Sequence, residues 1–140
     1  MTPLGSLVGI PWLAGGRGRQ GIDCVGLVLL AQWTLWGRWF PWPHAYNPER
    51  DTDQEERIFD WLPTVAIPCD GQTLGGIVVL WLTLGGRRYG HVATFVNVDT
   101  ILHTYPGGAS RLSRFSSGHA RRARAYFRSR EEGSGCPERP

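Results

Sequence analysis

The sequence predicts an α+β fold, because helical spacing of apolar residues dominates its first half and strand-like runs dominate its second. Apolar side chains recur every three or four residues in segments 24–36 and 55–62. Runs rich in β-branched and aromatic residues follow at 77–84, 91–98 and 101–105, with a last short run at 123–128. Helices first and a meander of strands afterwards form an α+β arrangement.

The composition fits one compact domain. The chain has 140 residues, of which 41% are hydrophobic and 19% charged, enough to build a single core. We expect that domain to occupy residues 1–130. Residues 131–140 contain Gly-Ser-Gly and two prolines, and we expect them to form a flexible tail.

The first helix is predicted over residues 24–36, between an N-cap at Asp23 and a stop at Gly37. Apolar residues at helical spacing form one face: Cys24, Leu27, Val28, Ala31 and Leu35. Further apolar residues fill the other faces: Leu29, Leu30 and Trp33. Such a helix is expected to be buried nearly all round.

A rigid aromatic loop over 39–44 separates this helix from a second, shorter one. The run Thr52-Asp-Gln-Glu55 is a capping box, and Pro63 is expected to end the helix. Ile58, Phe59 and Leu62 form its apolar side. The first strand, 77–84, then ends at Gly85-Gly86.

Charge and cysteine usage exclude several classes of protein. The net charge is only +3, and no apolar run approaches the roughly 20 residues of a membrane span. The N-terminus lacks a signal-peptide pattern, so we expect a soluble protein made in a cytoplasm. Three cysteines without paired spacing, and no CxxC or HxxxH pattern, predict neither a disulfide framework nor a metal or other cofactor.

Two further patterns suggest binding sites only weakly. The Gly-rich segment 9–21 lacks the residue order of a phosphate loop, so it does not predict nucleotide binding. Residues 111–130 hold seven arginines and no acid, which suits nucleic acid, an anionic wall polymer, or merely a solvated strand and loop. We favour the solvated surface and expect no nucleic-acid partner.

Cys24 is a candidate nucleophile because it stands at the start of the predicted helix. Unpaired N–H groups and the positive end of the helix dipole favour a thiolate there. An imidazolium nearby would lower the thiol pKa further. The alternative is an inert, small core residue, which is what most lone cysteines are.

Two histidines strengthen the case for chemistry. His91 opens one predicted strand and His103 lies inside the next, 12 residues later. A turn with an odd number of residues, such as three centred on Val98, places both rings on one face, roughly 7–8 Å apart at the backbone. An even turn places them on opposite faces. On one face, one histidine can take the thiol proton while the other orients it.

These residues carry a family resemblance. The run Gly21-Ile-Asp23-Cys24-Val-Gly26-Leu27-Val28, preceded by Pro11-Trp12-Leu-Ala-Gly15-Gly16 and followed by His91-Val-Ala-Thr-Phe-Val and Ile101-Leu-His103, resembles the NlpC-type cell-wall cysteine peptidases. The resemblance implies a papain-like fold in which a buried N-terminal helix carrying the cysteine packs on an antiparallel sheet carrying the histidines. It implies Cys24 as nucleophile, His91 as general base and His103 as the orienting group. The Cys24 N–H and Trp12 would form the oxyanion site.

The implied reaction is hydrolysis of an amide in the peptide stem of bacterial peptidoglycan, commonly the γ-D-glutamyl–diamino acid bond. Trp12, Val25 and Gly75-Gly76 replace the family's usual Tyr, Ser and Gly-Asp, and look like the variation of phage-tail members. We therefore expect a tail-associated wall hydrolase with other tail proteins as partners. Segments 38–50 and 106–120 would be its specificity loops.

Some alternatives remain open. The chain is also compatible with a tail-assembly protein of weak or no activity, or with a related thiol amidase or acyltransferase. Metal-dependent hydrolysis through Cys24, His91 and His103 is a more remote reading. Arg17 and Arg19 are either carboxylate-binding residues or solvated loop charges.

Overall fold

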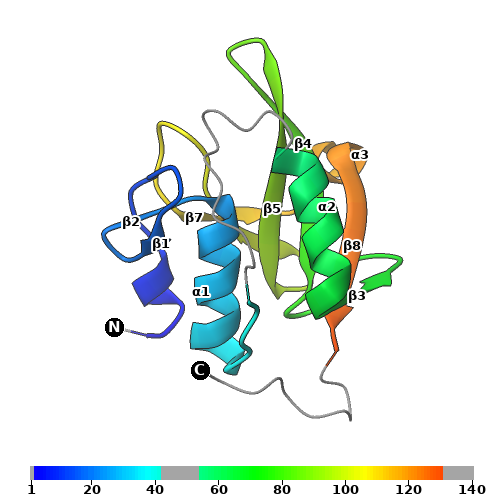
Figure 1. The fold of residues 1–140 in the computed structure, drawn as a ribbon, viewed down its shortest axis with the longest axis horizontal. Helices are drawn as coiled ribbons and strands as arrows, with labels where there is room; N and C mark the ends of the chain where they lie inside the picture. Colours follow the sequence, from blue (N-terminus) through cyan, green and yellow to red (C-terminus); the bar gives the residue numbers. More distant parts are fainter. Residues whose placement is uncertain (1, 42–53, 131–140) are drawn as a thin grey trace.

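An antiparallel sheet of six strands forms the centre of the molecule (Figure 1). The computed structural model describes residues 2–41 and 54–130. In chain order the elements are η1 (Gly5–Leu7), β1 (Arg17–Gly18), β2 (Gly21–Ile22), α1 (Cys24–Trp36), α2 (Gln54–Val65), β3 (Ala66–Cys69), β4 (Ile77–Leu84), β5 (Arg87–Asn97), β6 (Thr100–His103), β7 (Arg111–Arg114), α3 (Ser117–Arg122) and β8 (Ala123–Ser129). The order in the sheet is β3-β8-β4-β5-β6-β7, and β1 and β2 form a separate small pair. The predicted α+β class is confirmed.

Helix α1 has the predicted bounds. Asp23 accepts a hydrogen bond from the backbone N–H of Gly26 as the N-cap, and Gly37 ends the helix in the left-handed conformation, with φ of +65°. The sequence predicted that this helix is buried on all sides, but only its first turn is fully buried. Trp33 is 39% exposed, so the C-terminal half of the helix reaches the surface, which corrects the prediction.

The sequence predicted that the second helix ends at Pro63. Helix α2 instead continues to Val65. Pro63 lies in the last turn, where Thr64 Oγ1 donates to the carbonyl of Trp61 at 2.5 Å. Ile58 and Leu62 are buried, as expected from the periodicity. The predicted capping box begins outside the described residues. Residues 42–44 of the aromatic loop and the tail 131–140 also lie outside them.

Strand β5 begins four residues earlier than predicted. Gly85 and Gly86, with φ of +57° and +78°, form the two-residue turn between β4 and β5. Positive φ at both positions suits a tight hairpin, which continues the pairing up to Leu84 and Arg87. His91 therefore lies inside β5 and does not open it.

The two faces of the sheet bury different sets of side chains. Helices α1 and α2 cover one face, where Cys24, Val25 and Val28 pack in one cluster with Ile58, Leu62, Val79, Val92 and Phe127. The opposite face buries a second cluster, Val78, Leu80, Ala93, Phe95, Ile101 and Phe115. A third cluster places Leu27 and Ala31 of α1 against Leu102 of β6 and the N-terminal segment.

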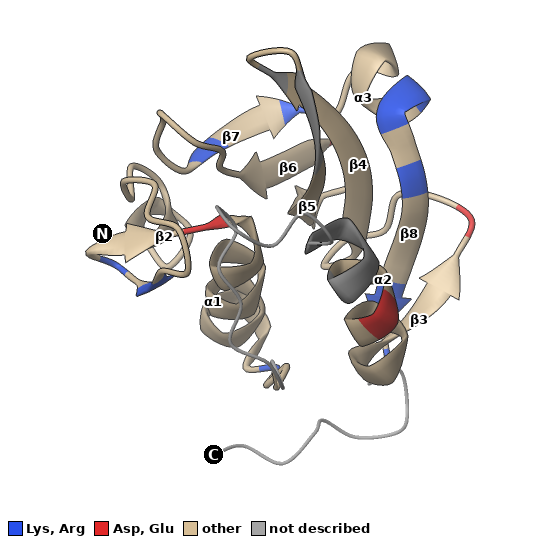
Figure 2. Ribbon diagram, turned by 45° about the horizontal axis from the view of Figure 1, so that its top comes forward, with Lys and Arg blue, Asp and Glu red and all other residues tan. Residues whose placement is uncertain are grey.

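The segment 106–120 is more ordered than a specificity loop. It contains β7, which pairs with β6, and the first turn of α3, where Ser116 and His119 form a capping box. The short, arginine-rich sequence of β7 has no strand-like apolar run, so the pattern did not reveal it. Figure 2 shows arginines on β7, at the end of α3 and along β8.

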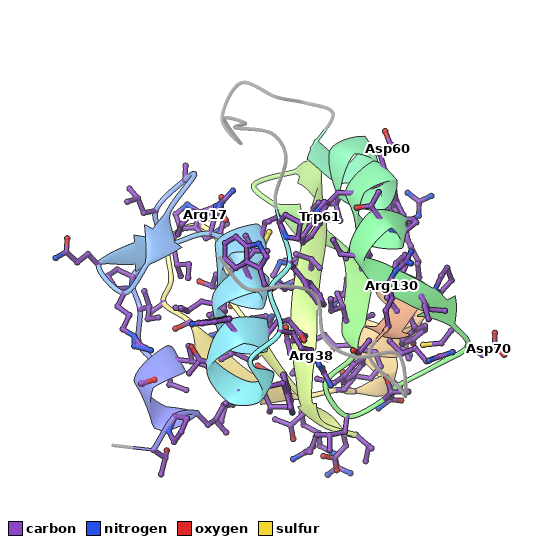
Figure 3. All side chains as sticks on the ribbon, turned by 60° about the horizontal axis from the view of Figure 1, so that its bottom comes forward. Arg17, Arg38, Asp60, Trp61, Asp70 and Arg130 are labelled. Carbon is purple, nitrogen blue, oxygen red and sulfur yellow. The ribbon has the colours of Figure 1, made fainter. Side chains whose placement is uncertain are left out.

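The C-terminal end of α1 is tied to the loop before β4. Gln32 Nε2 donates to the carbonyl of Gly75 at 3.0 Å, and Arg38 Nη1 donates to Gln32 Oε1 at 3.1 Å. Gly75 has a φ of +76°, and a Cβ there would lie 2.7 Å from Arg38 Nη1. Arg38 and Arg17 lie near opposite ends of α1 (Figure 3).

Candidate active site

The start of α1 is fixed by one buried carboxylate. Asp23 is 0% exposed, and its Oδ1 accepts from Gly26 N at 2.8 Å and from Arg17 Nη1 at 2.7 Å. Its Oδ2 accepts from Gly15 N at 2.9 Å. The same side chain therefore caps the helix and holds the Gly-rich segment against it. These contacts fix the backbone on both sides of Cys24.

Close backbone packing explains two glycines around the cysteine. A Cβ on Gly26 would lie 2.2 Å from the carbonyl oxygen of Gly16. A Cβ on Gly16 would lie 2.3 Å from the carbonyl oxygen of Gly21. Both distances are far inside van der Waals contact, so the first turn of α1 admits no side chain at position 26.

Cys24 is the first residue of α1 and is 2% exposed. Its thiol has a hydrogen bond with the backbone of Val92, the residue that follows His91 on β5. Since Cys24 and Val92 also share one hydrophobic cluster, the helix start packs directly against this part of β5. The N–H groups of a first helical turn have no intrahelical acceptor and can bind a developing oxyanion.

The thiol is neutral in the resting structure. Burial raises the pKa of Cys24 to about 12, and the charge of Asp23 acts in the same direction. Hydrogen bonds from the backbone of Val92 and Val25, together with the charge of Arg17, lower the pKa by less. The sequence analysis expected the N–H groups and the dipole of the helix start, with a nearby imidazolium, to favour a thiolate at Cys24. Desolvation of the buried thiol outweighs these effects here.

The two histidines lie on one face of the sheet, in contact. His91 Nε2 is 3.1 Å from His103 Nδ1, and the rings are 2% and 4% exposed. The turn between β5 and β6 has two residues, Val98 and Asp99, and not the three predicted. Val96 forms a bulge, an extra residue of β5 with no partner on β6. This extra residue has the same effect as a three-residue turn: it places His91 and His103 on the same face of the sheet.

The sequence predicted that the strand carrying His103 extends to residue 105, but β6 ends at His103. His103 is therefore the last paired residue before the chain leaves the sheet. On the next strand, Ser113 Oγ lies 2.8 Å from His103 Nε2. Tyr105 and His119 place their ring centroids 6.0 and 6.1 Å from that of His103. Both nitrogens of His103 are therefore engaged, one by His91 and one by Ser113.

Both buried imidazoles are neutral near pH 7. Burial lowers the pKa of His91 to about 3, and the nearby His103 and His119 contribute in the same direction. Burial also lowers the pKa of His103 to about 4, with further contributions from Arg111 and His119. A neutral imidazole can accept a proton, so both rings have the protonation state that a general base needs.

Trp12 lies at the edge of the hydrophobic cluster that contains Cys24. Its backbone pairs with Ile22, two residues before the cysteine, and donates to the carbonyl of Gly108 at 3.1 Å. The structure thus places Trp12, which belongs to the Gly-rich segment, near the start of α1 and beside the loop after β6.

The other candidate residues have different surroundings. Arg17 forms an ion pair with Asp23, so its charge serves the helix cap. Arg19 is exposed. The thiol of Cys69 donates to the carbonyl of Gly71 at 3.5 Å, on β3 and the turn after it, and Cys136 lies outside the described residues.

Within residues 2–41 and 54–130, no three His, Cys, Asp or Glu side chains converge as a metal site would require. No helix of this part of the chain has the length and hydropathy needed to cross a membrane.

Sequence reasoning missed Ser113. Its only signal was that Arg111 and Ser113 alternate with Leu112 in a segment after His103, which indicates two side chains on one face of a strand. With just four residues and two arginines, that strand had no recognisable core pattern.

Comparison with known proteins agrees with this architecture. No protein-family model matches the chain, and no curated protein matches it. Among solved structures, the chain is similar to the NlpC/p60 domain of the peptidoglycan hydrolase SagA, with a TM-score of 0.52 and 17% sequence identity. The match covers 89% of this chain and 94% of that domain. At this identity the likeness concerns the fold: the chain has the papain-like α+β fold of an NlpC/p60 domain, as the sequence predicted.

Proposed function

We propose that this chain is a cysteine peptidase that hydrolyses an amide bond in the peptide stems of bacterial peptidoglycan. The observation that carries the proposal is the buried pair of His91 on β5 and His103 on β6, whose ring nitrogens are 3.1 Å apart. The residue after His91, Val92, forms a backbone hydrogen bond with the thiol of Cys24. The peptidoglycan substrate is suggested by the shared fold with a peptidoglycan hydrolase domain. The preferred bond is γ-D-glutamyl to a diamino acid, as the sequence motif implies.

In the proposed reaction, His91 takes the proton of the Cys24 thiol as the sulfur attacks the carbonyl carbon of the substrate. Because His91 Nε2 is engaged by His103, Nδ1 is the nitrogen that receives this proton. The N–H of Cys24, with Trp12 alongside, stabilises the oxyanion. His91 then donates its proton to the leaving amine as the C–N bond breaks, and water, activated by His91, hydrolyses the thioester.

Transfer of the proton within a buried site also accounts for the neutral resting state. A lone thiolate or a lone imidazolium is costly in an apolar environment, but the two charges formed together attract one another. The thiolate therefore arises during attack and does not persist beforehand. Substrate that excludes water strengthens this attraction.

The test is cleavage of purified peptidoglycan by wild type and by Cys24→Ala, with Cys69→Ala as the matched control. We expect Cys24→Ala to lower the rate of stem-fragment release by roughly a thousandfold or more. Cys69→Ala, a substitution of the same type away from the candidate site, is expected to retain the wild-type rate. No release by wild type, or equal release by Cys24→Ala, contradicts the proposal. Mass spectrometry of the fragments identifies the bond.

We also propose that the protein acts as part of a phage tail, on the basis of the Trp12, Val25 and Gly76 departures from the family motif. The measurement is proteomic analysis of purified particles from a phage that encodes the chain. Its absence from the particles contradicts this location.

A second candidate function is structural, as a tail-assembly protein without hydrolytic activity. The observation that favours it is the thiol of Cys24, which is 2% exposed and has a pKa of about 12. Under this function, wild type releases no fragments, and Cys24→Ala supports tail assembly as well as wild type does.

A further inference from the structure

A line of hydrogen bonds crosses three neighbouring strands and ends at Ser113. His91 on β5 contacts His103 on β6 at 3.1 Å, and His103 contacts Ser113 on β7 at 2.8 Å. The register explains the second contact: Ser113 pairs with Ile101, which places it diagonally beside His103 on the same face. The two atoms of His103 involved are Nδ1 and Nε2, the whole hydrogen-bonding capacity of the ring.

The direction of each bond follows from the role of His91, and this step rests on the proposed function. To accept the thiol proton at Nδ1, neutral His91 must carry its hydrogen on Nε2. That Nε2–H then donates to His103 Nδ1, which must be unprotonated. Because His103 is neutral as well, its single hydrogen lies on Nε2 and donates to Ser113 Oγ.

We propose that Ser113 is a positioning residue of the active site: its hydroxyl oxygen accepts from His103 Nε2–H and thereby fixes the tautomers of both histidines. Loss of the hydroxyl removes the acceptor that favours the Nε2–H form of His103. If the hydrogen of His103 then moves to Nδ1, it donates to His91 Nε2, and His91 holds its own hydrogen on Nδ1. In that form the lone pair of His91 is on Nε2, so Nδ1 cannot accept the thiol proton.

Ser113 is well suited to this role. It is half-buried on a paired strand, so its Cα is fixed by the sheet. The other groups around His103 are His91, Arg111, Tyr105 and His119. Arg111 is a cation and has no acceptor to offer; its guanidinium lies over the Tyr105 ring, 4.6 Å from the centroid. Among the side chains for which a contact with His103 is described, the hydroxyl of Ser113 is the one at Nε2.

The experiment compares the full-length wild type with Ser113→Ala, Ser113→Thr and Leu112→Ala. Leu112 is on the same strand but faces away and is 41% exposed, so its variant controls for disturbance of β7. Long-range ¹H–¹⁵N spectra of the histidine rings report the tautomers directly, and fragment release from peptidoglycan reports kcat and KM.

We expect His91 and His103 to be Nε2–H tautomers at pH 7 in wild type. Ser113→Ala is expected to convert a large share of His103 to the Nδ1–H form and to lower kcat by roughly 10- to 100-fold with KM unchanged. Ser113→Thr restores both readouts, and Leu112→Ala changes neither. An Nδ1–H form of His103 in wild type, or an unchanged His103 tautomer in Ser113→Ala, overturns the inference.

The spectra also separate this inference from the proposed function. If wild type cleaves no peptidoglycan but its histidines show the expected tautomers and the expected response to Ser113→Ala, the peptidase proposal fails while the ring arrangement stands. If wild type cleaves and Ser113→Ala cleaves equally well, Ser113 is not a positioning residue.

Discussion

At the scale of single residues, the candidate site is defined by desolvation. Cys24, His91 and His103 are each at most 4% exposed. Burial raises the pKa of the thiol and lowers the pKa values of the two imidazoles, so all three groups are neutral near pH 7. The sequence predicted that Cys24 begins a helix capped by Asp23, and it allowed the two histidines to share a face if the turn between their strands was odd. It did not predict their protonation states, because those depend on how closely the surrounding chain excludes water.

The raised pKa of Cys24 predicts slow alkylation in acid. In a Cys69→Ala/Cys136→Ala variant, where Cys24 is the sole cysteine, the rate of iodoacetamide labelling should rise about tenfold per pH unit from pH 6 to 10, because the thiolate is the reactive form. Mass spectrometry of samples quenched over time gives the rate. Rapid labelling at pH 6 that does not change with pH would mean that the thiol is already ionised.

The lowered histidine pKa values predict that hydrolysis persists in mild acid. His91 must be unprotonated to act as base, and with pKa values of about 3 and about 4 for His91 and His103, both rings are neutral at pH 5. We expect kcat to stay near its neutral value at pH 5 and to fall only as the pH approaches 4. A kcat profile that falls with a midpoint near 6.5, the ordinary histidine value, contradicts this.

At the scale of elements, the sequence predicted α1 to the residue, because a capping residue defines each of its ends. Asp23 and Gly37 bound α1 as expected, and the Gly85-Gly86 pair ended β4 as expected. The sequence was less informative where pairing decides the ends. β5 extends back to Arg87 because its partner continues, and the Val96 bulge has no signature in residue type. β7 forms because β6 offers it an edge, so its own composition did not reveal it.

The first turn of α1 gives a prediction in which two effects oppose one another. Gly26→Ala gains about 1 kcal/mol of helix propensity. The new Cβ, however, would lie 2.2 Å from the carbonyl oxygen of Gly16 and 2.9 Å from Ile22 Cγ1. Since both neighbours are fixed, we expect a net loss of about 1–3 kcal/mol in the free energy of unfolding, measured by urea denaturation.

Gly18→Ala is the matched control, because a Cβ there meets nothing within 4 Å and its φ is not in the left-handed region. Its stability should stay within about 0.5 kcal/mol of wild type. A Gly26→Ala variant as stable as Gly18→Ala would show that the Gly-rich segment moves aside without cost.

At the scale of the whole molecule, the buried histidines link stability to pH. In the unfolded chain both rings titrate near 6.5, whereas in the folded protein they titrate at about 3 and about 4. Between these values the unfolded state binds more protons, so the free energy of unfolding decreases as the pH falls.

We expect this loss to begin near pH 6.5 and to reach a slope of up to about 2.7 kcal/mol per pH unit around pH 5, the limit for two protons. Urea denaturation from pH 7 to 4.5 measures it. The double variant His91→Gln/His103→Gln, which has neither group, should show a much weaker dependence. Equal slopes in the two proteins would assign the acid sensitivity to other groups.

The position of β8 has a consequence for how the protein is made. This strand, Ala123–Ser129, comes last among the described elements, yet it lies between β3 and β4 and pairs with both. While a ribosome is still translating residues before Ala123, the β4–β5 hairpin can form, but β3 has no neighbour and β4 presents a bare edge. Nascent chains stalled before residue 123 should therefore attract chaperones, and completion of the sheet must wait until β8 has left the exit tunnel.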